Sequence, residues 1–219
     1  MAQQILVIGL GQFGMSLAAA LTNKGAEVLA VDTRKNLVEE ASSFVTEAVV
    51  MNAADETELA KLEPGKRDVA VCAIGEDSKE SSIICTALLR QMGTPCVIAR
   101  ANNPMHQRIL QLVGAHQIVN PEQEFGKRLA NRLVYSHLIA DMPLGDGLHL
   151  SEISVKKDMV GKSLIELALP KKFGIMVVAI RRGTPSSVFQ PNPSEPLQEN
   201  DNLVLVSKEE AIKRLMEVK

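Results

Sequence analysis

The sequence predicts an α/β protein in which a doubly wound parallel sheet is followed by a small C-terminal α+β module. From residue 4 to about residue 120, short β-branched apolar runs alternate with longer segments whose apolar residues have helical spacing. This alternation is typical of strands that crossover helices bury on both faces. Beyond the turn-rich segment Asp141–Gly147 the alternation stops. We therefore expect an N-terminal domain over residues 1–140 and a C-terminal module over residues 141–219.

The N-terminal domain is expected to contain six strands with a helix between each pair. The predicted strands are Ile5–Ile8, Val28–Val31, Ala48–Met51, Val69–Ala73, Cys96–Ala99 and Gln117–Val119. The predicted helices lie near Phe13–Asn23, Leu37–Phe44, Glu56–Leu62, Lys79–Met92 and Met105–Val113. The joints are short and contain Gly, Asn or Pro, which end helices and form turns.

A further amphipathic helix is predicted over Glu122–Leu138, because Phe125, Leu129 and Leu133 recur at a spacing of four. Such a helix could pack on its own sheet or reach a second subunit, and the sequence leaves both open. We expect Asp141–Gly147 to be a linker. The C-terminal module is predicted to have strands at Leu148–Val155, Ile175–Ile180 and Leu203–Val206, helices at Lys162–Leu169 and Lys208–Val218, and a proline-rich loop at Gly183–Pro196.

Composition and charge exclude several classes of protein. The 219 residues are 46% hydrophobic and 23% charged, with a formal net charge of −2. That balance argues against nucleic acid as the main partner, since binding a phosphate backbone needs clustered Lys and Arg. No secretory signal and no membrane-spanning apolar run is recognised, which predicts a cytoplasmic protein. The three cysteines form no CxxC pair and are expected to be reduced core thiols.

The strongest candidate site is the glycine loop that follows the first predicted strand and opens the first predicted helix. In that context GxGxxG predicts a Rossmann-like nucleotide-binding turn. Gly9 permits the tight turn, Gly11 lets backbone approach a phosphate, and Gly14 lets the helix pack close to the strand. The helix N-terminus then presents free N–H groups to the phosphates. The candidate residues of this loop are Gly9, Gly11, Gln12, Phe13 and Gly14.

The second predicted strand ends in an acidic residue, Asp32. At this position a carboxylate accepts hydrogen bonds from both ribose hydroxyls of a bound nucleotide, and it repels a 2′-phosphate, so NADP is disfavoured. Thr33 and Arg34 follow and are included in the candidate site. Arg34 is expected to lie over the adenine ring, and a solvated Arg34 is the alternative.

The ends of the later strands supply the remaining candidates. Asn52 and Ala53 follow the third strand and suit the edge of an adenine base, whereas Asp55 is expected to cap the next helix. Arg100 ends the fifth strand and is expected to reach a phosphate. Glu122 is either a Mg²⁺ ligand on the nucleotide or a helix cap, because a carboxylate beside polyphosphate needs a bridging cation. The end of the fourth strand adds Ala73, Ile74 and Gly75.

No catalytic residue is predicted. The sequence contains no GxSxG, no P-loop lysine and no HExxH. Its four histidines are scattered, and His106 and His116 have no evident carboxylate partner. Nucleotide binding without an acid or base for the chemistry predicts a sensor rather than an enzyme. The alternative is an NAD-dependent oxidoreductase.

Several runs of the sequence occur together in one known family. They are ILVIGLGQFG, VLAVD, VTEAVVMNAADE, VAVCAIG, HQRILQLVGAH and NPE, followed by GKSLIEL and FGIMVVAIRRG. The first six resemble the RCK/KTN domain of Trk/Ktr-type potassium-uptake regulators. The last two resemble the RCK C-terminal module of the same proteins. Together they extend over nearly the whole chain.

This resemblance implies a cytoplasmic regulatory subunit docked under a membrane potassium-translocating subunit, with dimers assembling into an octameric ring. It implies that ATP or ADP, or alternatively NAD or NADH, binds the N-terminal domain, with Glu122 near the γ-phosphate through Mg²⁺. The helix after Glu122 would cross between dimer partners. Gln12 stands where many such regulators carry arginine, so a preference for ATP over ADP is not implied.

The same resemblance raises a second ligand. The C-terminal module of some relatives binds cyclic di-AMP at its dimer interface. Lys171 and Lys172 are compatible with that ligand, whereas Pro170 stands where some binders have arginine.

Overall fold

The N-terminal sheet consists of parallel strands in the order β3-β2-β1-β4-β5-β6. The structure is a computed structural model, which describes residues 2–75, 78–183 and 187–217. The strands are β1 (Gln4–Ile8), β2 (Glu27–Asp32), β3 (Glu47–Val50), β4 (Val69–Cys72), β5 (Cys96–Arg100) and β6 (Gln117–Val119). This is the strand order of a doubly wound Rossmann sheet, so the predicted fold class is confirmed.

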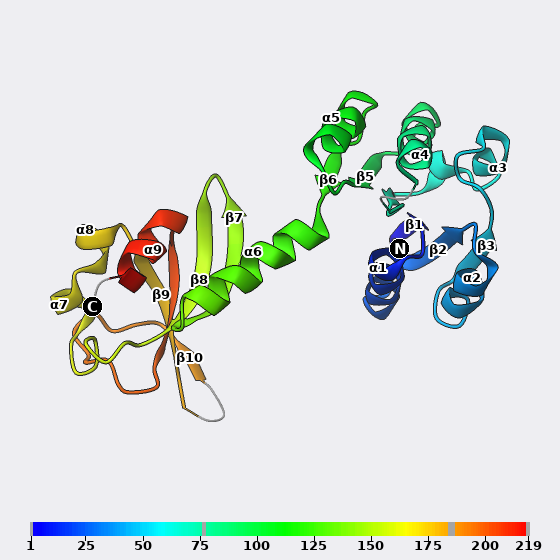
Figure 1. The fold of residues 1–219 in the computed structure, drawn as a ribbon. Coiled ribbons are helices and arrows are strands. Elements are labelled where there is room, and N and C mark those ends of the chain that lie inside the picture. Colours follow the sequence, from blue (N-terminus) through cyan, green and yellow to red (C-terminus); the bar gives the residue numbers. More distant parts are fainter. Residues whose placement is uncertain (1, 76–77, 184–186, 218–219) are drawn as a thin grey trace. The chain divides into compact units, whose positions relative to one another are not determined.

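Helices cover both faces of this sheet (Figure 1). One face carries α1 (Gln12–Asn23) and α2 (Lys35–Ala41), and the other carries α3 (Glu56–Ala60), α4 (Lys79–Gln91) and α5 (Pro104–Leu112), with a 3₁₀ turn η1 (Pro64–Lys66) before β4. Successive residues of β1 point to opposite faces, as in any strand. Val7 therefore joins the core under α1 and α2, whereas Leu6 and Ile8 join the core under the other three helices.

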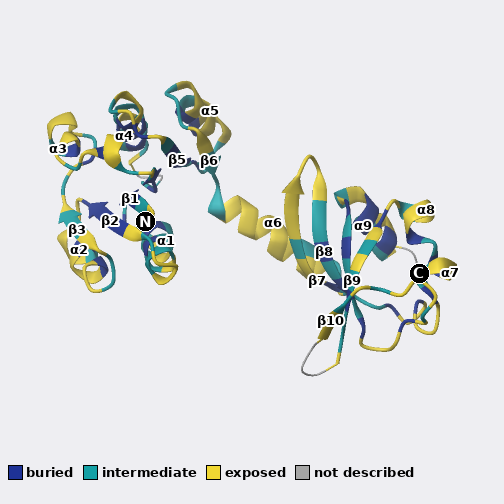
Figure 2. Cartoon of the chain, turned by 180° about the vertical axis from the view of Figure 1, so that it is seen from behind, coloured by how far each residue is buried: buried dark blue, intermediate teal, exposed yellow. Residues whose placement is uncertain are grey.

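The helix α6 (Pro121–Val134) follows β6 and contains no buried residue. Its apolar side chains lie open to solvent: Phe125 is 62% exposed and Leu133 is 77% exposed, as the colouring of Figure 2 shows for the helix as a whole. The chain divides into two compact units along this helix, residues 1–124 and residues 125–219. The boundary expected after residue 140 lies inside the strand that follows α6.

The second unit is built on an antiparallel sheet in the order β10-β9-β11-β8-β7. Its strands are β7 (Leu138–Gly145), β8 (Leu148–Ser154), β9 (Met176–Arg182), β10 (Ser187–Phe189) and β11 (Asn202–Lys208), and its helices are α7 (Leu164–Leu167), α8 (Leu169–Phe173) and α9 (Glu209–Glu217). Ile153, Leu203 and Leu205 are fully buried and pack with Ile212 and Leu215 of α9. The expected α+β module is therefore present.

Three local predictions for this half of the chain are wrong. Asp141–Gly147 is not a linker, because Leu138–Gly145 forms β7 and pairs with β8 as a hairpin. The hairpin turns at Asp146 and Gly147, whose φ angles are 51° and 74°, as a two-residue turn between twisted strands requires. For the same reason the helix predicted to reach Leu138 ends at Val134. The loop predicted at Gly183–Pro196 contains β10, with residues 184–186 outside the described part.

None of the helices described in the structure combines the length and the apolar character needed to cross a bilayer. All three cysteines are free thiols. Cys72 and Cys85 are buried in the first unit, whereas Cys96 is only half-buried. The prediction of core thiols is therefore confirmed for the first two.

Candidate functional site

A cavity of about 400 Å³ lies at the carboxyl ends of the parallel strands. Strands of a parallel sheet all end at one edge, so residues far apart in sequence meet there. The structure brings to its wall the predicted residues Gly9, Gly11, Asp32, Thr33, Arg34, Asn52, Ala53, Ala73, Ile74, Gly75 and Arg100.

Five wall residues were missed by the sequence reasoning. Ile8, Val31 and Met51 come from strand ends that the apolar pattern assigns only to the core. Ser78 and Ser81 come from the start of α4, next to Gly75. The sequence did contain a signal for these two serines, because hydroxyl residues at the start of a helix at the carboxyl edge of the sheet can face a bound anion.

Four predicted residues lie outside the cavity wall. Gln12 is exposed at the start of α1, and Gly14 is buried behind it. Phe13 places its ring 5.8 Å from the guanidinium carbon of Arg100. Glu122 forms an ion pair with Arg100.

The fold places different requirements on the three glycine positions of the loop. Gly9 has φ of 93°, and a Cβ there would lie 2.9 Å from the Ile74 backbone nitrogen. A Cβ on Gly14 would lie 1.8 Å from the Gly9 carbonyl oxygen. At Gly11, by contrast, an added Cβ meets no described atom within 4 Å, and the backbone has an ordinary φ of −65°. The fold therefore requires glycine at the first and third positions and has no requirement for it at Gly11.

Gly11 is also the N-cap of α1, and no side chain caps this helix. The first backbone N–H groups of an α-helix have no partner within the helix. Together with the positive end of the helix dipole they favour an anion. Because Gly11 lines the cavity, these donors lie at its edge.

The Asp32 carboxylate is held by four hydrogen bonds. Its Oδ2 accepts from the Leu10 backbone N–H at 2.7 Å and from Arg34 Nη2 at 3.1 Å. Its Oδ1 accepts from the Arg34 backbone N–H at 2.9 Å and from Arg34 Nε at 3.0 Å. Arg34 was expected over an adenine ring or in solvent, and the structure instead folds it onto Asp32.

The Asp32 carboxyl group is charged in this setting. Burial raises its pKa, but the hydrogen bonds from Arg34 and from the Leu10 N–H outweigh burial, so its pKa lies below the ordinary value. The Asp32 side chain is 6% exposed and that of Arg34 is 58% exposed. The negative charge is therefore fixed in the wall, whereas its cationic partner reaches into solvent.

Arg100 occupies another part of the wall and is less completely engaged. Its Nη2 donates to Glu122 Oε1, whose side chain is 55% exposed, while the Arg100 side chain is 14% exposed. Within the described residues, Arg100 Nε has no hydrogen-bond partner. The helix cap considered for Glu122 is provided instead by Asn120, whose Oδ1 accepts from the Gln123 N–H at 3.0 Å.

Two other expectations about charge can be compared with the structure. The predicted helix cap at Asp55 is confirmed, since its carboxylate accepts from the Glu58 N–H at 3.0 Å. For Mg²⁺, no group of three or more His, Cys, Asp or Glu side chains is placed to hold a metal among the residues that the structure describes. Glu122 is already paired with Arg100, so the residues that the structure describes do not by themselves fit a resident Mg²⁺.

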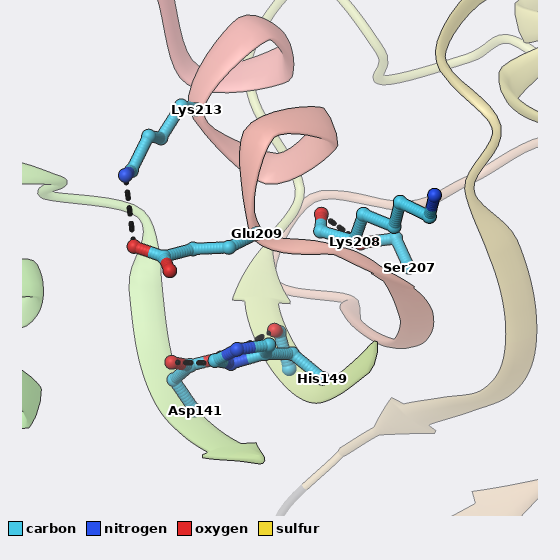
Figure 3. Close-up of polar contacts among 7 residues, drawn as sticks. Asp141, His149, Ser207, Lys208, Glu209 and Lys213 are labelled. Atoms are coloured by element: carbon cyan, nitrogen blue, oxygen red, sulfur yellow. Dashed lines mark hydrogen bonds and ion pairs between the residues drawn. The ribbon is translucent and has the colours of Figure 1, made fainter. Parts of the chain in front are cut away.

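A cluster of polar side chains in the second unit lies on the two strands of the hairpin (Figure 3). His149 Nδ1 is 3.0 Å from Asp141 Oδ2, and Ser151 Oγ donates to Asp141 Oδ1 at 2.8 Å. Asp141, the carboxylate partner of His149, lies on β7 in the segment that was predicted to be a linker. The cavity beside Asp141 measures only about 10 Å³, too small for anything beyond a water molecule.

A second arginine cluster in this unit is more tightly built. Arg182 donates through Nε and Nη2 to the two oxygens of Asp201, at 2.6 and 2.8 Å, and through Nη1 to Glu195 at 2.8 Å. Its guanidinium carbon lies 5.2 Å from the centre of the Phe189 ring. The Asp201 side chain is fully buried, and it also accepts from the Gln198 N–H at 2.8 Å.

Comparison with known proteins agrees with this geometry. Residues 5–121 match the TrkA-N domain family and residues 149–219 match the TrkA-C domain family. Over 210 residues the chain is 35% identical to Ktr system potassium uptake protein A of Vibrio alginolyticus, covering 96% of this chain and 94% of that protein. Over 206 residues it is 32% identical to Ktr system potassium uptake protein C of Bacillus subtilis (strain 168), covering 94% and 92% respectively.

Solved structures show the same fold. The GsuK channel superposes with a TM-score of 0.67 at 19% identity, over 99% of this chain and 39% of that chain. The GsuK channel bound to NAD gives 0.65 at 19% identity, over 100% and 40%. This chain thus spans about two fifths of each channel chain, and the likeness concerns the fold. With both domain families matched in order and the Ktr proteins aligned over nearly their full length, the chain belongs to the Trk/Ktr family of potassium-uptake proteins.

Proposed function

We propose that this chain is a cytoplasmic regulatory subunit that senses an adenine nucleotide and gates a membrane potassium-uptake channel or transporter. Family membership supports the potassium-uptake role. The cavity at the strand ends supports the nucleotide, because about 400 Å³ lies within the usual range of small-molecule pockets. The proteins of similar fold include GsuK structures described as bound to NAD and to ADP.

The observation that carries the proposal is the empty space above Gly11. This glycine lines the cavity at the start of α1, where nothing in the protein itself requires glycine. A ligand that approaches the backbone closely would require it, and a phosphate group is the ligand that a helix N-terminus favours. In this proposal Asp32 binds the ribose, Asn52 and Ala53 contact the base, and Arg100 binds a phosphate.

ATP or ADP is the leading ligand, and NAD or NADH is the alternative. Mg²⁺ enters the proposal only as a counter-ion carried by the nucleotide, since that ion commonly keeps phosphate and water ligands and takes few from protein. Cyclic di-AMP stays a secondary candidate for the C-terminal module, near Lys171 and Lys172 in the last turn of α8.

The proposal includes self-assembly into dimers and an octameric ring beneath the membrane subunit. Its support is the uncovered apolar side chains of α6, including Phe125, Leu129 and Leu133. Soluble proteins seldom leave such a group of side chains uncovered unless it meets another surface. Signalling then needs no catalysis: the ligand acts by binding one conformation of the assembly better than another.

The test is ligand binding by the full chain and by Gly11→Ala. Calorimetric titration with ATP, ADP, NAD⁺ and NADH, each with and without Mg²⁺, should give saturable binding of at least one nucleotide by the wild type. Gly11→Ala should weaken that binding at least about tenfold, because its methyl group takes the space of a phosphate oxygen. Its folding cost should be small, about 1 kcal/mol at an N-cap.

Gly126→Ala is the matched control, since Gly126 lies in α6 and a Cβ there also meets no described atom within 4 Å. It should bind like the wild type. Unchanged affinity in Gly11→Ala would remove the phosphate from this loop. Steady oxidation of NADH with carbonyl substrates by the wild type would favour the oxidoreductase instead.

A further inference from the structure

The Asp32 carboxylate has no acceptor position left for a ribose. A carboxylate offers about four lone-pair positions, and Asp32 receives four hydrogen bonds from Leu10 and Arg34. A ribose diol that binds this carboxylate must therefore replace two donors that are already in place.

The four donors differ in how easily they leave. Two are backbone N–H groups, of Leu10 and Arg34, and the chain fixes them. The other two are Nε and Nη2 of the Arg34 guanidinium, on a side chain that is 58% exposed. Rotation of that side chain releases one position on each carboxylate oxygen, which is the pattern that two adjacent hydroxyl groups need.

We propose that Arg34 is a specificity-determining residue that competes with the ribose hydroxyls of the nucleotide for Asp32. This inference rests on the proposed function, because it assumes that the cavity holds a nucleotide. A ligand with both ribose hydroxyls forms two new hydrogen bonds to the charged Asp32 carboxylate, and these offset the loss of the Arg34 guanidinium. A ligand without them leaves Arg34 on Asp32.

The expected change in nucleotide affinity follows from the exposure of the Arg34 side chain. An arginine–carboxylate pair with one exposed partner is weak, so its removal should change nucleotide affinity by about two- to fivefold. Whether the affinity rises or falls is the informative result. A residue that contacts the ligand loses affinity when truncated, whereas a competitor gains it. Lowered pKa of Asp32 and raised pKa of Arg34 agree with a formed pair before the ligand arrives.

The experiment compares ADP with 2′,3′-dideoxy-ADP on the full chain, for the wild type and Arg34→Ala. ADP should bind Arg34→Ala about two- to fivefold more tightly than the wild type. The dideoxy ligand should bind both proteins equally, because it does not displace Arg34. Asp32 keeps two backbone hydrogen bonds in the variant, and thermal unfolding checks that the variant is folded.

Two further variants separate charge from geometry. Arg34→Lys keeps the positive charge without the two-pronged guanidinium and should also tighten ADP, though less. Lys35→Ala removes a neighbouring charge that pairs with Glu39 at 3.4 Å and should leave the ratio of the two ligands unchanged.

Three results would overturn the inference. They are a loss of ADP affinity in Arg34→Ala, no change in it, or an equal gain for both ligands. If ADP binds the wild type and Gly11→Ala abolishes that binding, the proposed function survives these results. If no nucleotide binds the wild type, the proposed function fails and this inference fails with it.

Discussion

Arg100 of the first unit and Arg182 of the second are built from the same parts and differ in completeness. Each guanidinium has a carboxylate partner and a phenylalanine ring within 6 Å, at 5.8 Å for Phe13 and 5.2 Å for Phe189. Arg182 makes three hydrogen bonds to two carboxylates, one of them fully buried. Arg100 has one half-exposed carboxylate and an Nε without a partner among the described residues.

Arginine therefore serves two purposes in this protein. Donors that are all satisfied by the protein hold the chain together and leave nothing for a ligand. Donors left over at the edge of a cavity are available to an anion that enters it. In the second unit Arg182 thus stabilises the fold, whereas in the first unit, on our proposal, Arg100 binds the ligand.

The largest effect is expected from truncating Arg182. Arg182→Ala leaves the buried Asp201 carboxylate without its main partner, so the second unit should lose about 3 kcal/mol of unfolding free energy. Tyr135 is the single tyrosine of a chain without tryptophan and packs against the core of that unit, so its fluorescence during urea unfolding measures this loss. Arg100→Ala should leave the Tyr135 transition unchanged, and a similar loss in both variants would end the distinction.

Acid should loosen the second unit through Asp201. Burial raises the pKa of this carboxyl, but the hydrogen bonds from Arg182 and from the Gln198 N–H outweigh burial and leave its pKa below the ordinary 3.8. Its contribution to stability is therefore complete above the unfolded-state pKa and is lost as pH falls through the lowered folded-state pKa.

Urea unfolding followed by Tyr135 from about pH 5 to about pH 2 measures that loss. The slope of stability against pH should be shallower in Asp201→Asn than in the wild type. Equal slopes in the two proteins would show that other carboxyl groups carry the acid response.

A smaller effect, on binding, is expected from Arg100→Ala. Nucleotide affinity should fall about tenfold, since a hydrogen bond to a charged phosphate is worth about 1.5 kcal/mol or more. Stability of the first unit should change by less than about 1 kcal/mol, because the lost partner Glu122 is half-exposed. Arg108→Ala removes an exposed arginine of α5 and serves as the control in titration and in far-ultraviolet circular dichroism of unfolding.

The smallest effect is expected from Glu122→Gln. Releasing Arg100 from this carboxylate should tighten nucleotide binding about two- to threefold, equally with and without Mg²⁺. Glu124→Gln makes the same charge change in the first turn of α6 and should have no such effect. Weaker binding of Glu122→Gln that appears only with Mg²⁺ would instead assign Glu122 to the cation.

The hairpin of β7 and β8 shows why part of the fold could not be predicted from local sequence. Asp146-Gly147 is a strong turn signal between alternating apolar residues, but Pro143 and Gly145 stand beside it and usually argue against a strand. β7 is the last strand of its sheet, and an edge strand tolerates both residues because one side needs no pairing. The context that decides the matter is the sheet order, which local sequence does not contain.

Most of the cavity wall, by contrast, follows from the sequence. Once parallel strands are recognised, their carboxyl ends must share one edge, and this places Gly9, Asp32 and Arg100 together. The hydrogen bonds of Arg34 to Asp32 and the place of Ser78 in the cavity wall do not follow from the sequence. They depend on which side-chain rotamers the neighbouring loops allow, and loops leave that choice to tertiary contacts.

The exposed helix α6 has a consequence for when its own residues become ordered. It has 14 residues and none is buried, and a helix of that length is only marginally stable in water on its own. Its winding therefore depends on whatever surface meets its apolar side chains. If the proposed self-assembly covers those side chains, diluting the protein should speed amide exchange along residues 121–134 before it affects either sheet. The helical order of this segment would then depend on the concentration of the protein itself.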